Sequence, residues 1–157
     1  MIDERAASPR IGAEGGYPAI AELIPHEGRM VLLEQMLEWA PGFALCRMRV
    51  REGSPYVSQG ELAAAFTLEA MAQCVAACLG YEAFRGGEGV RVGMIIACRR
   101  FTVHRAKVAA GRELSIRARR TRGNDSLSHF ECEVRDSEES VADALLTLFH
   151  GERPPGF

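Results

Sequence analysis

The chain has 157 residues, of which 47% are hydrophobic and 25% are charged, and its formal net charge is −2. These values fit one globular domain with a single core and argue against a second domain. The small net charge also argues against a general nucleic-acid-binding protein.

Cysteine usage indicates the cellular compartment. The five cysteines form an odd number without a CxxC pair, and the start, MIDERAASPR, lacks the basic and apolar run of a secretory signal. We therefore expect a reduced, cytoplasmic protein. Cys74 and Cys78 lie four residues apart, but no further ligands follow at metal-like spacing, so both are expected to be buried by packing and no metal site is predicted.

The two ends of the chain differ from its middle. Residues 1–16 are polar, Gly-rich and without periodicity, which predicts a flexible arm, and residues 151–157, GERPPGF, are expected to form a tail. The folded domain is therefore expected to span residues 17–150. Its first segment, YPAIAELIP, predicts a short helix that Pro25 ends, because the residue before a proline is displaced from the helical region.

A hairpin is predicted next. Two strand-like runs, residues 29–39 and 43–51, are joined by Pro41-Gly42, a turn dipeptide. The second run alternates between apolar and mainly basic residues, so one of its faces is expected to be core and the other solvent. The core face comprises Ala44, Cys46, Met48 and Val50.

A long helix is predicted after the loop GSPYVSQG. Ser58 and Glu61 have the S-x-x-E spacing of a capping box, and Gly86-Gly87 ends the apolar pattern after about Phe84. A row of small residues on this helix would let strands approach its backbone closely. The row is Ala72, Ala76 and Gly80.

The middle of this helix, FTLEAMAQCVAACLG, is apolar enough to be compared with a membrane span, which needs about 20 apolar residues. Thr67, Glu69 and Gln73 interrupt the run, and alanine dominates it. We therefore expect a buried helix in a soluble protein, wrapped on most sides by a sheet, and no membrane partner.

Four further strand-like runs complete the domain. Hairpin-type turns separate all four, at Ala110-Gly111, residues 123–125 and residues 136–140, and the first and last runs are apolar on both faces, as central strands are. The element order predicts an α+β fold in which an antiparallel sheet, ending in a four-strand meander, wraps around one long central helix. The runs are residues 90–104, 112–122, 126–135 and 141–150.

Two motifs carry a family resemblance. LEAMAQ at residues 68–73 and the upstream LIPH at residues 23–26 resemble the hotdog-fold 3-hydroxyacyl-[acyl-carrier-protein] dehydratases. The run LIPHEGRMVLLEQMLEW, the SPYV loop and the lack of a proline-glycine helix start resemble more closely the divergent branch found in aryl polyene and related polyketide-like clusters. The resemblance covers about residues 17–150.

The resemblance implies dehydration of a 3-hydroxyacyl thioester to a trans-2-enoyl thioester without metal or organic cofactor. The acyl group would be carried by an acyl carrier protein or coenzyme A. The family implies a homodimer or higher hotdog oligomer, and a heterodimer with a second dehydratase-like chain is an alternative. A histidine of one subunit would remove the proton next to the thioester carbonyl, and a carboxylic acid on the long helix of the other would protonate the leaving hydroxyl.

Five residues are expected in the site. Glu69 matches the family's acid and is expected to be buried among apolar neighbours. The family's usual histidine falls at Pro55, so His26 is expected to replace it as base across the dimer interface. The substrate-binding candidates are the Ala64 amide for the carbonyl oxygen, Tyr56 at the tunnel mouth, and Gln73, which can also hold the Glu69 carboxyl by a hydrogen bond.

A basic stretch lies between Arg99 and Arg122, where nine Lys or Arg residues accompany one acid, Glu113. One interpretation is a solvated strand face, the usual meaning of a charge run. The other is a docking surface for an acidic acyl carrier protein. The docking candidates are Arg99, Arg100, Arg105 and Lys107.

Three alternatives to dehydration stay open. A hotdog thioesterase would use Glu69 to activate water, and a non-catalytic acyl-binding or regulatory subunit would bind substrate without converting it. In the third, Glu69 has only a structural role in helix packing. Reaction products separate the first two possibilities from dehydration, and a Glu69→Leu variant that gains stability and keeps its activity would establish the third.

Overall fold

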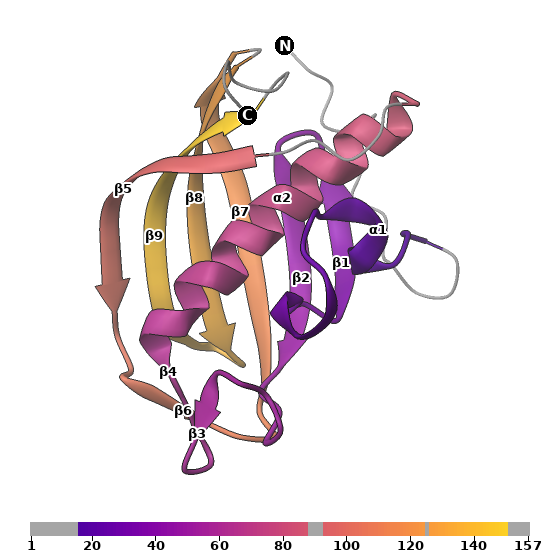
Figure 1. Ribbon diagram of the computed structural model, residues 1–157. Coiled ribbons are helices and arrows are strands. Elements are labelled where there is room, and N and C mark those ends of the chain that lie inside the picture. The colour runs from indigo at the N-terminus through magenta and orange to yellow at the C-terminus, as the bar shows by residue number, and fades with distance from the viewer. Residues whose placement is uncertain (1–15, 88–92, 125, 151–157) are drawn as a thin grey trace.

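A six-stranded antiparallel sheet curves around one long helix, α2 (Thr67–Arg85), which crosses its concave face (Figure 1). The computed structural model describes residues 16–87, 93–124 and 126–150. The predicted α+β class, with an antiparallel sheet around one long helix, is confirmed. The predicted tail and, apart from Gly16, the predicted arm lie outside the described residues.

The large sheet contains two groups of strands that follow one another in the chain, and one strand that joins the far edge out of chain order. Its order is β1 (Gln35–Ala40), β2 (Phe43–Arg49), β7 (Glu113–Gly123), β8 (Leu127–Asp136), β9 (Glu139–His150) and β5 (Gly93–Val103). The hairpin predicted at Pro41-Gly42 is confirmed, with Gly42 at a φ of 72°. The predicted four-strand meander was wrong, because β5 pairs with β9 at the far edge and only β7, β8 and β9 follow one another.

Strand β5 is an edge strand rather than the central strand that its sequence indicates. Four apolar side chains on it are exposed: Met94, Ile95, Ile96 and Val103. The strand is apolar on both faces, a pattern that a buried central strand and an edge awaiting a partner share. The pattern therefore identifies apolar surface without showing what covers it.

The predicted capping box was also wrong. Residues 57–63 form a small hairpin of β3 (Val57–Ser58) and β4 (Glu61–Ala63), and β4 pairs on its other side with β6 (Lys107–Ala109). Gln59 and Gly60 both have positive φ, 53° and 75°, as the two central residues of a tight hairpin turn require. A short 3-10 helix, η2 (Ala64–Phe66), then leads into α2, whose start has no side-chain cap.

Helix α2 supplies the centre of the core. Cys74 and Cys78 are fully buried, and burial raises the pKa of both thiols, so the predicted packing role is confirmed. The helix is long and apolar enough to cross a membrane, but 67% of its most apolar window is buried within the domain. That burial is typical of the core helix of a soluble protein.

Gly80 on α2 is the contact point for the short helix α1 (Ile20–Leu23). A Cβ at Gly80 would lie 1.9 Å from the carbonyl oxygen of Leu23, closer than two non-bonded heavy atoms can approach. The small-residue row was expected to admit strands, and at Gly80 it admits the backbone of α1 instead. Because α1 leads directly into Pro25 and His26, this contact fixes where the next loop begins.

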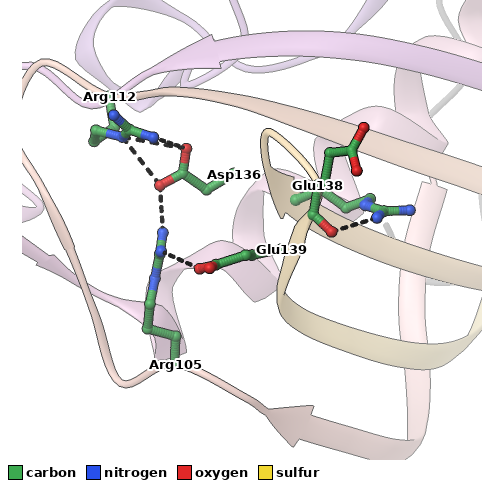
Figure 2. A network of polar contacts seen from close by, with 6 residues as sticks. Arg105, Arg112, Asp136, Glu138 and Glu139 are labelled. Carbon is green, nitrogen blue, oxygen red and sulfur yellow. Dashed lines mark hydrogen bonds and ion pairs between the residues drawn. The ribbon is translucent and has the colours of Figure 1, made fainter.

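Asp136 joins three segments at one end of the sheet (Figure 2). Its carboxylate is 4% exposed and accepts hydrogen bonds from Arg112, which binds both oxygens, and from Arg105. Arg105 also binds Glu139 at 3.1 Å. Hydrogen bonding by Arg112 in the first place, and then by Arg105, lowers the pKa of Asp136. The network ties the β5–β6 connection to the start of β7 and the β8–β9 turn.

Replacing Asp136 with asparagine should lower the free energy of unfolding by about 2 kcal/mol near pH 7, the scale of a hydrogen-bonded charged group. The folded aspartate protonates below the ordinary value near pH 4, so its contribution is complete above that value and lost as the pH falls further. Urea unfolding from about pH 3 to 8 should therefore show the two proteins converging in acid. A constant gap across that range would contradict the assignment.

Candidate active site

Gln73 organises the centre of the candidate site. Its side chain is fully buried on α2. The amide oxygen accepts a hydrogen bond from the backbone N–H of Leu32 at 2.9 Å, and the amide nitrogen donates to the carbonyl of Met30 at 2.6 Å. The same nitrogen donates to Oε1 of Glu69 at 3.1 Å. Gln73 therefore ties the segment after His26 to the helix that carries Glu69.

This anchoring explains why residues 29–33 do not form the predicted start of a strand. Residues Gly28–Met30 form a 3-10 helix, η1, and the chain joins β2 only from Glu34, whose N–H donates to the carbonyl of Arg47 at 2.8 Å. We call residues 28–34 the bridging segment, because it runs from the His26 loop over α2 to the sheet.

His26 and Glu69 of the same chain are in direct contact. Nε2 of His26 lies 3.1 Å from Oε1 of Glu69. The sequence predicts that these residues meet across a dimer interface. In this chain they already meet within one subunit, because α1 and the Gln73 contacts fold the His26 loop back onto its own helix. A separation of 3.1 Å also leaves no room for a substrate carbon between the two groups.

The contact with Glu69 determines which ring nitrogen of His26 carries the hydrogen. Nδ1 of His26 is buried and has no hydrogen-bond partner among the residues that the structure describes. In the neutral ring, Nε2–H then donates to the carboxyl oxygen and Nδ1 keeps its lone pair. His26 thus presents one buried nitrogen that can accept a proton.

Glu69 is more accessible than its apolar sequence context indicates. Its side chain is 35% exposed, so the expected burial among neighbouring apolar residues was wrong. Helical geometry turns Glu69 toward the His26 loop, whereas Ala70 and Met71 face the core. Both donors, Gln73 and His26, converge on Oε1. Within the described residues Oε2 has no partner and is the oxygen free to exchange a proton.

An apolar wall lies beside the pair. Tyr56 packs edge-on against Phe66 with ring centroids 5.3 Å apart, and its hydroxyl lies 3.3 Å from the sulfur of Met30. Met30 and Phe66 are both exposed. Phe66 is three residues before Glu69 in the chain, and Met30 belongs to the bridging segment that Gln73 holds. The sequence pattern singled out Tyr56 but gave no signal for the other two residues.

The expected role of Ala64 is contradicted. Its N–H donates to the carbonyl of Ala106 at 2.8 Å, and its side chain is buried. This amide therefore cannot also hold a substrate carbonyl oxygen. Gln73 likewise is enclosed and bonded within the chain, which leaves it a positioning role instead of the substrate contact that was expected.

The basic stretch is largely neutralised by acids that are distant in sequence. Arg100 lies 3.5 Å from Asp143, Arg105 binds Asp136 and Glu139, and Lys107 lies 3.9 Å from Glu61. Arg112, Arg117 and Arg120 also have acidic partners. Of the four docking candidates, Arg99 alone lacks an acidic partner among the described residues. The pattern favours a solvated strand face over a concentrated positive surface.

Comparisons with known proteins give a family and a fold. The family model described as "ApeP-like: ApeP dehydratase" matches residues 18–155. A search of curated proteins found no match. Among solved structures, the dehydratase heterocomplex ApeI:P from Xenorhabdus doucetiae contains a chain with a TM-score of 0.82 and 24% identity, and the alignment covers 87% of this chain and 93% of that one.

Two further structures share the hotdog fold more distantly. The TT0310 protein from Thermus thermophilus gives a TM-score of 0.57 at 22% identity, with 73% of this chain and 89% of that chain covered. The PaaI protein of the phenylacetic acid degradation operon of E. coli gives 0.58 at 14% identity, with 73% and 77% covered. The lower scores agree with a common sheet and helix whose surrounding segments differ.

Proposed function

Because the chain belongs to the ApeP-like dehydratase family, we propose that it converts a 3-hydroxyacyl thioester to a trans-2-enoyl thioester in polyketide-like biosynthesis. The observation that carries this proposal is the 3.1 Å contact between His26 and Glu69. Dehydration needs a base for the proton next to the thioester carbonyl and an acid for the leaving hydroxyl. The pair supplies both at one position.

His26 acts as the base, and Glu69 acts as the acid through Oε2. The C–H bond breaks as the His26 imidazole takes the proton, the electrons of that bond form the carbon–carbon double bond, and the hydroxyl leaves as water with the proton of Glu69. The imidazolium and carboxylate that result already lie in contact at Nε2 and Oε1. Their opposite charges stabilise each other until exchange with solvent resets the two protons.

The substrate lies alongside the pair, since 3.1 Å leaves no space between the two groups. The exposed side chains of Met30 and Phe66, with Tyr56, offer apolar surface for an acyl chain next to Glu69. Gln73 acts as a positioning residue, because its three hydrogen bonds hold the bridging segment and the Glu69 carboxyl in one arrangement.

The reaction is tested by product analysis. The purified protein would be incubated with 3-hydroxyacyl and saturated acyl thioesters, each linked to an acyl carrier protein or to coenzyme A. We expect the 3-hydroxy substrates to lose about 18 mass units, the mass of one water, without release of free thiol. Free thiol from a saturated substrate would indicate a thioesterase, and unchanged substrate that stays bound would indicate a non-catalytic acyl-binding subunit.

The subunit partner is proposed to sit on the β5 edge. The exposed apolar residues of β5 lie on an edge strand whose outer backbone groups can pair with another strand. A second hotdog chain fits this edge, either another copy or a related dehydratase chain. The similar ApeI:P structure is itself described as a heterocomplex. All five cysteines are free, which agrees with the reduced, cytoplasmic setting that we propose.

Replacing Ile96 with lysine should separate the subunits. Ile96 is 53% exposed, so the charge should leave the folded chain intact while placing an unpaired ammonium in an apolar interface. Light scattering after gel filtration should show at least a roughly tenfold weaker association, equivalent to about 1.4 kcal/mol or more. The control is Arg117→Gln, which lies away from the edge on β7. Unchanged association of the Ile96 variant would contradict the proposed interface.

A further inference from the structure

The thioester carbonyl oxygen of the substrate still lacks a hydrogen-bond donor in the site. Removal of the neighbouring proton places negative charge on this oxygen, and a donor aimed at such a charge is a large contribution to catalysis. The expected donor, the N–H of Ala64, is bonded to the carbonyl of Ala106 at 2.8 Å. The buried amide of Gln73 is bonded within the chain. The reaction therefore calls for a donor elsewhere beside the His26–Glu69 pair.

Tyr56 is presented by a tight turn. The N–H of Val57 donates to the carbonyl of Ser54 at 3.1 Å, which closes a four-residue turn with Pro55 at its second position. Proline presets the backbone angle that this position requires. The N–H of Tyr56 donates to the hydroxyl of Ser54 at 3.3 Å, and Val57 then enters β3. Pro55, where the family's usual histidine would fall, thus helps to fix the position of the next side chain.

Two routes of contact connect Tyr56 with Glu69. The ring of Tyr56 packs edge-on against Phe66 at 5.3 Å, and residues three apart on a helical surface, such as Phe66 and Glu69, are neighbours. The hydroxyl of Tyr56 lies 3.3 Å from the sulfur of Met30. The carbonyl of Met30 in turn accepts a hydrogen bond from Gln73, which also holds the Glu69 carboxyl. Tyr56 therefore lies next to the face of the site that carries Glu69.

The hydroxyl of Tyr56 is available to a ligand. A thioether sulfur is a weak acceptor, and within the described residues the hydroxyl has no other hydrogen-bond partner. The Met30 side chain is 51% exposed and unbranched, so it can move aside. A carbonyl oxygen that gains negative charge is a much stronger acceptor than the sulfur. A bound thioester can therefore take this donor from Met30.

We infer that Tyr56 is a further catalytic residue, whose hydroxyl donates a hydrogen bond to the thioester carbonyl oxygen of the substrate. The inference rests on the dehydration proposed above. As His26 takes the proton next to the carbonyl, charge develops on the carbonyl oxygen and the hydroxyl stabilises it. When the double bond forms and water leaves, the carbonyl is restored. The proton of Tyr56 stays on Tyr56 throughout, so the balance of the reaction is unchanged.

Replacing Tyr56 with phenylalanine removes this donor and keeps the ring against Phe66. The change should lower kcat for dehydration about a hundredfold, as expected for loss of one donor to a developing oxyanion. KM should change by less than about threefold, because the carbonyl oxygen carries its charge only in the transition state. Steady-state kinetics with a 3-hydroxyacyl thioester measure both values, and a melting curve shows whether the fold is unchanged.

Two matched variants separate the hydroxyl from the ring. Tyr81→Phe removes a hydroxyl from the helix that carries Glu69, where Tyr81 packs against Tyr17 and Trp39, and it should leave kcat unchanged. Tyr56→Leu removes both the hydroxyl and the ring. It should lower kcat as Tyr56→Phe does and in addition raise KM, because the acyl chain loses part of its apolar wall.

Infrared spectroscopy tests the hydrogen bond without turnover. The probe is hexanoyl-coenzyme A with ¹³C at the thioester carbonyl, which has no 3-hydroxyl and cannot be dehydrated. A hydrogen bond weakens the carbonyl bond, so its stretch should lie at a lower frequency on the unchanged protein than on Tyr56→Phe. Equal frequencies on the two proteins would overturn the inference and assign the donor to another group, such as a backbone amide of η2.

Failure of this inference is distinguishable from failure of the proposed function. Full kcat in Tyr56→Phe, with an unchanged protein that dehydrates its substrate, would overturn only the role of Tyr56. An unchanged protein that binds thioesters without dehydrating them would contradict the proposed function, and the infrared comparison would still decide whether Tyr56 holds the carbonyl oxygen.

Discussion

Replacing Glu69 with glutamine should lower kcat for dehydration about a thousandfold, within the range for loss of a general acid. The amide oxygen of the variant can still accept the hydrogen bonds of Gln73 and His26, so the loop and helix should keep their arrangement. What is lost is the exchangeable proton on Oε2. The measurement is kcat with a 3-hydroxyacyl thioester, accompanied by a melting curve to show that the fold persists.

The matched control for this variant is Glu82→Gln. Glu82 lies on the same helix and its carboxylate is 3.4 Å from Arg120, away from His26. Its substitution should leave kcat within about twofold, because a partly exposed ion pair contributes little to stability. Full activity in Glu69→Gln would restore the purely structural interpretation of Glu69.

Replacing Gly80 with alanine should reduce both stability and activity, although Gly80 lies far from the reacting groups. In an ordinary helix interior this change stabilises by up to about 1 kcal/mol. Here the new methyl would lie 1.9 Å from the Leu23 carbonyl oxygen, so α1 must move. We expect a net loss of about 2 kcal/mol in the free energy of unfolding, the scale of an overpacked core.

The displacement should also reduce activity, because α1 carries the start of the His26 loop. A shift of about 1 Å at a positioned catalytic group can cost roughly a hundredfold in rate. Gly86→Ala is the control, since its added Cβ would meet only an ordinary contact of 3.5 Å at the end of the same helix. Chemical unfolding and kcat measured on both variants test the two effects. A stabilised, fully active Gly80 variant would contradict the packing account.

The elements with strong local signals were predictable from the sequence. The Pro41-Gly42 hairpin, the long helix and the inward face of β2 follow from turn residues and periodicity, and the structure confirms them. The hydrogen bond between Gln73 and Glu69 was also predictable, because residues four apart on a helix are neighbours.

The features that could not be predicted depend on contacts between residues that are distant in the sequence. The basic residues at 105 and 112 are neutralised by Asp136, and the amide of Ala64 is occupied by Ala106, a residue of a different segment. Ser58 and Glu61 have capping spacing, but pairing of β4 with β3 and β6 makes them strand residues. The spacing of residues in the sequence predicts local geometry, but it does not show which residues of distant segments will become partners.

The position of His26 shows the same limit. The motif identified both His26 and Glu69, but nothing in their spacing shows whether they meet within one subunit or between two. Gln73 decides this, because it holds the carbonyl of Met30 and the N–H of Leu32 and so returns the loop to its own helix. The available signal in the sequence was Gln73, a polar side chain in the middle of an apolar helix. It indicated that a hydrogen-bond partner exists, but not which residue that partner is.

The most direct test of the central claim uses hybrid dimers, purified through two different tags after co-expression. One hybrid joins His26→Ala to Glu69→Gln, and the other joins the unchanged chain to a chain with both substitutions. If the pair acts within one subunit, the first hybrid should be inactive and the second should keep about half of the dehydratase activity, since one of its two sites is intact. Activity in the first hybrid and none in the second would contradict the account and return His26 to the opposite side of the interface.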